Sequence, residues 1–266
     1  MKPAVRAIQA AYDATSRAWA DGPERMYARL AEVLVARSPV ALAGRIVLDI
    51  GAGTGVASRV LRTDGARPIG VDMSSAMLRH DAANRPPAAV ADAMALPFAN
   101  RSVGGAVYAF CLNHLDEPEV ALREAARVVE PGGVVLASAF SADWEPPEKE
   151  TMEAVLGRFG WSRPDWYEEL KDIDSLLGTA ERFAACAAAA GLVEVDAISV
   201  TVEKGLDRAK DVVAWRLGMP HTAPFVAALS SSERAALTAA AAVALAVDFQ
   251  PVRPRVVLLA TRVAET

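Results

Sequence analysis

Three closely spaced glycines follow an apolar segment near the N-terminal fifth of the chain. Residues 46–55 read I-V-L-D-I-G-A-G-T-G, which spaces Gly51, Gly53 and Gly55 as G-x-G-x-G. Glycines let a backbone adopt positive φ and approach a ligand closely, and the N–H groups of a following helix point toward that ligand. The segment is consistent with a dinucleotide phosphate site, a site for another adenosine-bearing cofactor, or a plain turn. The dinucleotide fingerprint has its third glycine one position later, where this sequence has Val56.

Acidic residues end three successive apolar segments. Asp49 ends the first, Asp72 lies in I-G-V-D-M and Asp92 lies in V-A-D-A-M-A-L-P-F. A carboxylate after the second strand can accept hydrogen bonds from both ribose hydroxyls, which indicates adenosine without distinguishing NAD from another cofactor. Asp92 can accept from an adenine amino group, and Ala93 offers a backbone N–H beside it. Singly, each aspartate is as well explained as a loop residue or helix cap, but three at one sheet edge favour an adenosine site.

Histidine is the residue type that titrates closest to neutral pH. His114, in F-C-L-N-H-L, follows the fourth expected strand and is the candidate general base, although it could equally cap or pack. His221, in G-M-P-H-T-A-P-F, is a second candidate on the substrate side, and His80 is expected at the surface. Three scattered histidines and two isolated cysteines predict no metal site.

Aromatic side chains are concentrated in residues 141–170. Such rings could cover the strand ends and bind a planar or apolar molecule, or they could anchor an irregular segment to the core. The residues expected to contact a substrate are Trp144, Trp161, Trp166, Tyr167 and His221.

The elements that must position these residues alternate between short apolar strands and amphipathic helices. Strands are expected at residues 46–50, 68–71, 88–91, 106–110, 134–140, 192–202 and 254–263. Helices are expected at residues 57–61, from Ser74 as an N-cap, at 119–129 up to Pro131-Gly132-Gly133, and at 179–190. This alternation predicts an α/β, Rossmann-like fold with a mostly parallel sheet, helices on both faces and the strand ends on one edge.

The chain is expected to form a single domain over residues 1–266. Its subdivisions are a helical N-terminal lid at 1–43, a cofactor-binding half at 44–140, substrate-covering helical insertions at 141–178 and 205–250, and C-terminal helix and strands at 179–204 and 251–266.

The composition is that of a globular protein, with 53% hydrophobic and 23% charged residues. A net charge of −5 without a basic stripe disfavours a nucleic-acid partner. The chain begins without an apolar secretion signal, and its most lipophilic segment, 235–247, is too short to span a bilayer. These features predict a soluble cytoplasmic protein without membrane association, and the exposed-looking helical insertion could support a homodimer.

Four segments taken together resemble the class I S-adenosylmethionine-dependent methyltransferases. They are V-L-D-I-G-A-G-T-G, G-V-D-M-S, A-D-A-M-A-L-P-F and L-R-E-A-A-R-V-V-E-P-G-G. The nearest subgroup is the small-molecule enzymes related to ubiquinone/menaquinone methyltransferases, and the resemblance is dense over residues 40–140 only. It implies a seven-stranded sheet whose last strand, 254–263, runs antiparallel, with S-adenosyl-L-methionine as cofactor and a small molecule as methyl acceptor.

The resemblance also implies contacts to the methionyl part of this cofactor. Gly51 and Gly53 would line it, and Asp49 would act on its amino group directly or through water. Phe110 would lie beside the methionyl group. Tyr12, on the N-terminal helix, would be a lid contact or, alternatively, an ordinary core-facing aromatic.

Contacts to the adenosine part are implied in the same way. Asp72 would hold the ribose, Met73 would pack on adenine, and Asp92 with Ala93 would read the adenine edge. One departure from the family concerns the fourth strand, which usually begins with an aspartate after an aromatic residue. Here the segment 102–108 reads S-V-G-G-A-V-Y, with glycine in its place.

The expected function is methyl transfer to a small apolar or aromatic metabolite, and natural-product biosynthesis is a candidate setting for it. The protein's main task would be to hold donor and acceptor collinear, and a base is needed only for an acceptor that enters protonated. Two alternatives stay open. The first is a protein that binds S-adenosylmethionine without methylating, such as a cyclase or a regulatory protein. The second is an NAD-dependent oxidoreductase, against which the glycine spacing and Asp92 count.

Overall fold

Seven strands form one sheet in the computed structural model, which describes residues 3–174 and 176–265. The strands are β1 Ile46–Ile50, β2 Arg67–Asp72, β3 Ala88–Val90, β4 Val103–Ala109, β5 Val129–Phe140, β6 Val193–Thr201 and β7 Arg255–Arg262. Their order is β3-β2-β1-β4-β5-β7-β6, and β7 runs antiparallel to both of its neighbours. The expected seven-stranded, mostly parallel sheet with an antiparallel last strand is confirmed.

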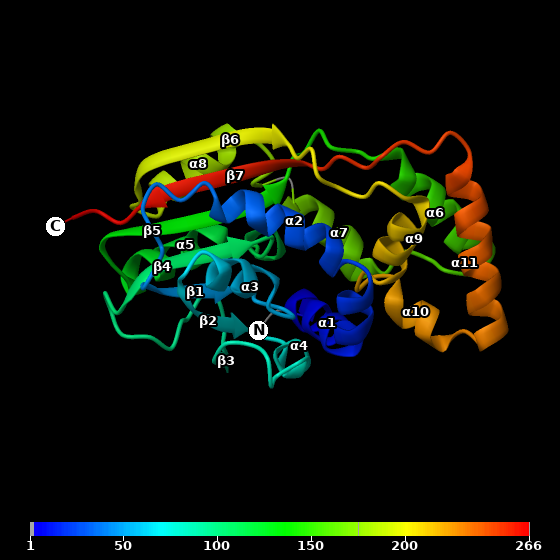
Figure 1. Cartoon of the computed structure of the whole chain (residues 1–266), viewed down its shortest axis with the longest axis horizontal. Helices are drawn as coiled ribbons and strands as arrows, with labels where there is room; N and C mark the ends of the chain where they lie inside the picture. The colour runs from blue at the N-terminus through cyan, green and yellow to red at the C-terminus, as the bar shows by residue number, and fades with distance from the viewer. Residues whose placement is uncertain (1–2, 175, 266) are drawn as a thin grey trace.

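Helices cover both faces of this sheet (Figure 1). They are α2 Glu24–Val35 and α3 Val56–Thr63 on one face, and α5 Pro118–Val128 and α8 Ala180–Ala189 on the other. Successive side chains of a strand point to opposite faces. In β5, Val134 and Leu136 accordingly pack into the core under α2, whereas Val135 and Ala137 pack into the core under α5. A strand buried on both faces must be apolar throughout, which explains the unbroken apolar segments of the sequence.

The structure differs from the sequence prediction where β4 meets β5. β5 begins at Val129, directly after α5, so Pro131-Gly132-Gly133 lies inside the strand and does not separate helix from strand. Val103 already pairs with Val129, before a shift in register. A Cβ on Gly105 would lie 3.1 Å from Cγ1 of Val134. This close strand approach leaves little room for the acidic side chain that the family usually has in this region.

Helix starts follow from polar residues at the expected positions. The Oγ of Ser74 accepts from the N–H of Met77 at 3.1 Å, which caps α4 (Ser75–Arg79) as predicted. Thr179 caps α8 by accepting from the N–H of Arg182 at 3.3 Å. Each bond satisfies an N–H that has no partner within its helix.

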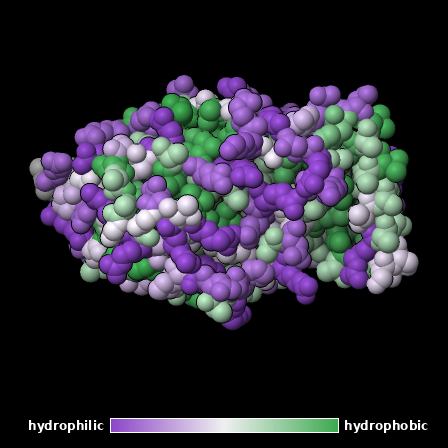
Figure 2. Space-filling view, in the orientation of Figure 1, coloured by the Kyte–Doolittle hydropathy of each residue, from purple (hydrophilic) through white to green (hydrophobic). Residues whose placement is uncertain are grey.

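The two insertions are helical and lie beyond the carboxyl ends of the parallel strands. Residues 141–178 contain α6 Pro147–Arg158 and α7 Asp165–Asp174, and residues 205–250 contain α9 Ala209–Leu217, α10 Ala223–Ala228 and α11 Ser231–Ala246. Figure 1 shows α6, α9, α10 and α11 together at one end of the molecule, with α1 (Pro3–Asp21) between them and the edge of the sheet. In Figure 2, hydrophobic side chains gather on the outer surface of that end, where Val243 and Val247 of α11 are 71% and 72% exposed. No helix within the described residues has the length and apolar character needed to cross a membrane.

Candidate functional site

The glycine loop between β1 and α3 adopts a backbone conformation that is unfavourable for residues other than glycine. Gly51, Gly53 and Gly55 have φ of +72°, +51° and +88°, all in the left-handed region that glycine adopts freely. Gly51 also lies against the segment that follows β4, because a Cβ placed on it would be 2.5 Å from Cβ of Cys111. The loop therefore needs glycine at this position for two independent reasons.

Two aspartates, the buried Asp49 and the partly buried Asp72, hold this loop in place. Oδ2 of Asp49 accepts hydrogen bonds from the N–H and the hydroxyl of Ser58, at 2.8 and 2.7 Å. Asp72 accepts from the N–H of Gly53 at 2.8 Å and from the N–H of Ser74 at 2.7 Å. Burial raises the pKa of Asp72, and it raises the pKa of Asp49 to about 6. Both aspartates also line a cavity, so they order the loop and face whatever binds there.

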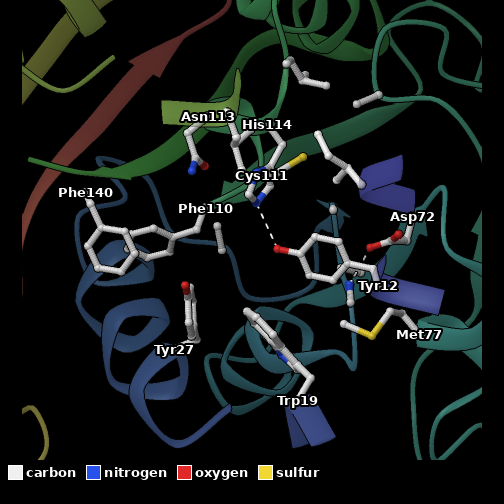
Figure 3. A pocket seen from close by; sticks show the side chains of 18 of the residues that line it. Tyr12, Trp19, Tyr27, Asp72, Met77, Phe110, Cys111, Asn113, His114 and Phe140 are labelled. Carbon is white, nitrogen blue, oxygen red and sulfur yellow. Dashed lines mark hydrogen bonds between the residues drawn. The ribbon is translucent and has the colours of Figure 1, made fainter. Parts of the chain in front are cut away.

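This cavity has a volume of about 490 Å³ and lies at the carboxyl ends of β1, β2, β4 and β5. Small-molecule sites typically occupy roughly 300–1,000 Å³. Figure 3 shows Asp72 and Met77 on one side and Tyr27, Phe110 and Phe140 on the other. We call the two sides the glycine end and the aromatic end. The glycine end comprises Asp49, Gly51, Gly53, Asp72, Met73, Asp92 and Ala93, and the aromatic end comprises Tyr27, Phe110, Phe140, Trp144 and Trp215.

The structure brings all of the residues assigned to the cofactor from the sequence to this one cavity. They are Tyr12, Asp49, Gly51, Gly53, Asp72, Met73, Asp92, Ala93 and Phe110. Asp92 is exposed, and its Oδ1 accepts from the N–H of Met94 at 2.9 Å within a turn, so it has the loop role considered as one of its alternatives and caps no helix of the described residues. The individual cofactor contacts stay predictions.

Phe110 occupies a strained backbone position next to Cys111, the residue against which Gly51 lies. Its φ is +58°, a conformation that costs a residue with a side chain roughly 1–3 kcal/mol and is concentrated at functional sites. Its N–H donates to the hydroxyl of Ser138 at 3.2 Å, and its ring lies 4.6 Å from that of Phe140 and 5.3 Å from that of Tyr27. These contacts fix the ring at the cavity wall.

Helix α1 is fastened to the glycine end by side-chain contacts. The amide of Gln9 donates to the carbonyl of Met73 at 2.9 Å, and the hydroxyl of Ser74 donates to Asp13 at 2.6 Å. Because α1 also lines the cavity, these bonds place it as a wall over the segment that follows β2.

Tyr12 and His114 join this helix to the segment after β4. The hydroxyl of Tyr12 and Nε2 of His114 lie 3.0 Å apart (Figure 3), and His114 belongs to a short 3₁₀ turn, η1 Leu112–His114. Burial lowers the pKa of His114 to about 4, so the imidazole is neutral at pH 7. Its Nδ1 is buried and has no partner among the described residues.

The residues assigned to the substrate divide into two groups. Trp144 and Tyr167 line the cavity, whereas Trp161, Trp166 and His221 are not among its lining residues. Nε1 of Trp161 donates to the carbonyl of His221 at 3.1 Å, and the His221 ring stacks on Tyr167 with centroids 3.9 Å apart. Trp161 and His221 thus support the wall that Tyr167 forms.

Sequence reasoning missed several rings that complete the aromatic end and its surroundings. Phe140 stacks on Trp144 at 4.9 Å, and Trp144 stacks on Trp215 at 6.2 Å. The missed lining residues include Trp19, Tyr27, Cys111, Asn113, Phe140 and Trp215. They come from elements far apart in the chain, so no local sequence pattern predicts that they lie together. The position of Phe140 at the carboxyl end of its strand was the one available signal.

Charges are divided between the two ends as well. The acids Asp49, Asp72 and Asp92 line the glycine end, and the lysine and arginine found among the described lining residues, Lys149 and Arg216, belong to the insertions. Burial raises the pKa of the Cys111 thiol far above its usual range, so this cysteine is not a thiolate nucleophile. The described residues contain no cluster of His, Cys, Asp and Glu that could hold a metal ion.

Comparison with known proteins identifies the family. The family described as "Methyltransferase domain" matches residues 48–137. The demethylmenaquinone methyltransferase of Mycolicibacterium paratuberculosis is 35% identical over 168 residues, which cover 60% of this chain and 71% of that protein. The corresponding protein of Renibacterium salmoninarum is 36% identical over 132 residues, 49% of this chain and 54% of its own length. The chain therefore spans only about half the length of this second relative.

A solved structure supports the same fold. An S-adenosylmethionine-dependent methyltransferase from Thermotoga maritima is 17% identical with a TM-score of 0.56, and the match covers 99% of this chain and 100% of that chain. The fold, the motifs in their order and the sequence identity lead to one conclusion: the chain belongs to the class I S-adenosylmethionine-dependent methyltransferases of the quinone methyltransferase type.

Proposed function

We propose that this protein transfers a methyl group from S-adenosylmethionine to a small planar acceptor of apolar or aromatic character. The observation that carries the proposal is the shared cavity. One side of it gathers the residues expected to bind the cofactor, and the other is walled by stacked rings. A place in natural-product biosynthesis remains part of the hypothesis.

The glycine end suits S-adenosylmethionine better than a dinucleotide. Asp72, whose carboxylate is held by Gly53 and Ser74, would take the ribose hydroxyls. A Cβ on Gly51 would fill the close approach to Cys111, so the loop there is shaped around a bare backbone. The described lining residues at this end include acids but neither lysine nor arginine. Arg85 lies behind the loop, where it donates to the carbonyl of Gly53 at 3.0 Å, so the cavity side of this end offers acids and not a cationic side chain to a pyrophosphate, which counts against NAD.

When bound, the cofactor supplies an electrophilic methyl group on a sulfonium. The chain's own contribution would be to orient the acceptor and exclude water, since holding two reactants in line can supply several kcal/mol of a barrier. Phe110 is buried and Phe140 and Trp144 are partly buried, so these rings would present apolar surface to an acceptor.

His114 is the proposed general base for a methyl acceptor that must lose a proton. Its neutral ring can accept a proton, and Tyr12 lies within hydrogen-bond distance of Nε2. A pKa of about 4 makes this a weak base. We therefore expect His114 to act as a base only on an acidic acceptor group, and to be dispensable for an acceptor that is already ionised or nucleophilic.

Binding titrations test the cofactor assignment. We expect S-adenosylhomocysteine, the demethylated cofactor, to bind in calorimetry, and NAD to show no binding under the same conditions. Tight NAD binding without binding of S-adenosylhomocysteine would overturn the proposal. Cofactor binding with no methyl transfer to any acceptor would favour the cyclase or regulatory alternative.

A homodimer is a further part of this hypothesis. The exposed Val243 and Val247 of α11 are apolar side chains on an outer helix. Sedimentation analysis of the full chain decides the question. A dimer that dissociates in a Val243→Asp variant supports it, and a monomer at all concentrations contradicts it.

A further inference from the structure

Arg216 is a buried arginine in the wall of the cavity, and the proposed reaction does not use it. It lies on α9, is 4% exposed, and its Cζ lies 5.3 Å from the centre of the Trp215 ring. A guanidinium stays charged in proteins and has five N–H donors and no acceptor. Burying such a charge is costly unless an anion or hydrogen bonds compensate it.

The carboxylate nearest to Arg216 is engaged with a different arginine. Oε2 of Glu153 accepts a hydrogen bond from Arg163, which also binds Glu168. Oε1 of Glu153 lies 3.6 Å from Nη2 of Arg216, beyond hydrogen-bond distance, and accepts no hydrogen bond from any described residue. The other polar contact of Arg216 is a 3.4 Å approach of Nη2 to Nε2 of His221, and Nε has no partner among the described residues. Arg216 thus forms an ion pair with Glu153, a carboxylate that it shares with Arg163, and its Nε keeps no hydrogen-bond partner within the described part of the chain.

A second donor on the neighbouring residue is also unsatisfied. Trp215 is 3% exposed and lines the cavity, and its Nε1 has no partner among the described residues. An indole N–H can only donate. Two adjacent cavity residues therefore carry N–H groups that need an acceptor. The other charged residues of the insertions in the wall, Glu145 and Lys149, have formal charges that cancel. Arg216 adds a positive charge to the wall, and its ion-pair partner Glu153 is shared with Arg163.

Arg216 lies at the end of the ring series that begins at Phe110. Phe110, Phe140, Trp144 and Trp215 follow one another with centroid distances of 4.6, 4.9 and 6.2 Å, and the guanidinium comes after Trp215. Arg216 therefore follows the ring of this series that is farthest along it from Phe110. The cation is thus in a position to read the part of the acceptor that is remote from the glycine end.

We propose that Arg216 binds an anionic group of the methyl acceptor, so that the acceptor is an aromatic acid carrying a carboxylate. The inference rests on the proposed function and deepens it, because it names the substrate class of the same cavity. A planar carboxylate matches the guanidinium fork and is an acceptor only, as a donor-only guanidinium requires. Arg216 is then a residue that determines specificity.

A matched pair of ligands tests this in the unaltered protein. The full chain, saturated with S-adenosylhomocysteine, is titrated calorimetrically with 2-naphthoate and with 2-naphthamide, which share a ring and differ in charge. We expect the carboxylate to bind at least tenfold more tightly than the amide. Equal affinities, or preference for the amide, would overturn the proposal without any need for a variant.

Two variants localise the effect. Arg216→Gln should abolish the preference for the carboxylate and leave the affinity for 2-naphthamide within twofold. Arg208→Gln removes an exposed arginine at the start of the same helix, one that pairs with Asp211, and should keep the preference. If Arg216→Gln retains the preference, the assignment to Arg216 is wrong.

The affinity for S-adenosylhomocysteine separates this inference from the proposed function. We expect it to be unchanged in Arg216→Gln. A tenfold loss there would show that Arg216 serves the carboxylate of the cofactor, which overturns the assignment to the acceptor. Failure of the unaltered chain to bind S-adenosylhomocysteine at all would instead count against the proposed function.

Discussion

The glycine end and the aromatic end of the cavity are assembled in opposite ways. The glycine end is made by short segments between Asp49 and Ala93, where backbone conformation and buried carboxylates do most of the positioning. The aromatic end is made by rings from α2, the ends of β4 and β5, the segment before α6, and α9. A cofactor that is shared across a family suits a site fixed by the backbone. An acceptor that varies between family members suits a site built from side chains of the insertions.

The largest effect is expected at Gly51, where backbone and packing demands coincide. In Gly51→Ala the new Cβ would meet Cβ of Cys111 at 2.5 Å, at a φ of +72°. We expect the free energy of unfolding to fall by roughly 2–4 kcal/mol and binding of S-adenosylhomocysteine to fall by a factor of about 100. Urea denaturation and calorimetry measure the two effects.

Gly44 provides a matched control for this substitution. It has a similar φ of +78°, but a Cβ there would have no neighbour within 4 Å. In Gly44→Ala the free energy of unfolding should fall by only about 1 kcal/mol, and the affinity for the cofactor should be unchanged. Equal losses of affinity in the two variants would mean that the close approach at Gly51 is unimportant.

A smaller effect is expected from Asp72→Asn, which keeps the shape of the side chain and removes its charge. The carboxylate accepts from Gly53 and Ser74 and is the proposed ribose ligand. Since hydrogen bonds to a charged group are roughly twice as strong as neutral ones, we expect affinity for S-adenosylhomocysteine to fall about 30-fold. The affinity for an aromatic carboxylate should stay the same. A loss confined to acceptor binding would contradict the division of the cavity into two ends.

A substitution in the aromatic end should weaken binding of the acceptor and leave binding of the cofactor unchanged. Trp144→Ala removes a ring stacked on Phe140 and Trp215, so we expect the KM for an aromatic acceptor to rise about tenfold, in line with ~1.4 kcal/mol from a lost ring contact. Affinity for S-adenosylhomocysteine should be unchanged. Trp166→Ala is the control, because Trp166 does not line the cavity. A similar rise in KM for Trp166→Ala would show that the insertion acts as a whole and not through these rings.

The smallest effect is a pH dependence at His114, which lies between the two ends. Its pKa is lowered from 6.5 to about 4 in the folded protein, so the unfolded chain takes up a proton first as the pH falls. The stability that this group contributes is therefore complete above pH 6.5 and is lost as the pH falls from 6.5 toward 4. Between pH 7.5 and pH 5, the free energy of unfolding of His114→Gln should therefore fall by roughly 1–2 kcal/mol less than that of the wild type. Urea denaturation at both pH values measures this difference. The same pH dependence of the free energy of unfolding in both proteins would contradict burial of a neutral imidazole.

Much of the fold and the glycine end could be predicted from sequence, for a physical reason. Strands buried on both faces, capped helices and glycines at positive φ leave local patterns, as in residues 46–55 and at Ser74. The predicted start of β5 was wrong because the pairing of Val103 with Val129 is a contact between strands and leaves no pattern in either segment. The aromatic end was only half predicted for the same reason. Trp144 and Trp161 look alike in the sequence, and only tertiary packing places one in the cavity and the other behind it.

Transfer of a labelled methyl group tests the central claim most directly. The protein is incubated with methyl-labelled S-adenosylmethionine and a set of small aromatic acceptors, including aromatic acids, with Asp72→Asn as a control. We predict that the label appears in at least one aromatic acceptor, and that this transfer is strongly reduced in the control. Cofactor binding without transfer to any acceptor in the set, or transfer that Asp72→Asn does not affect, would contradict the account.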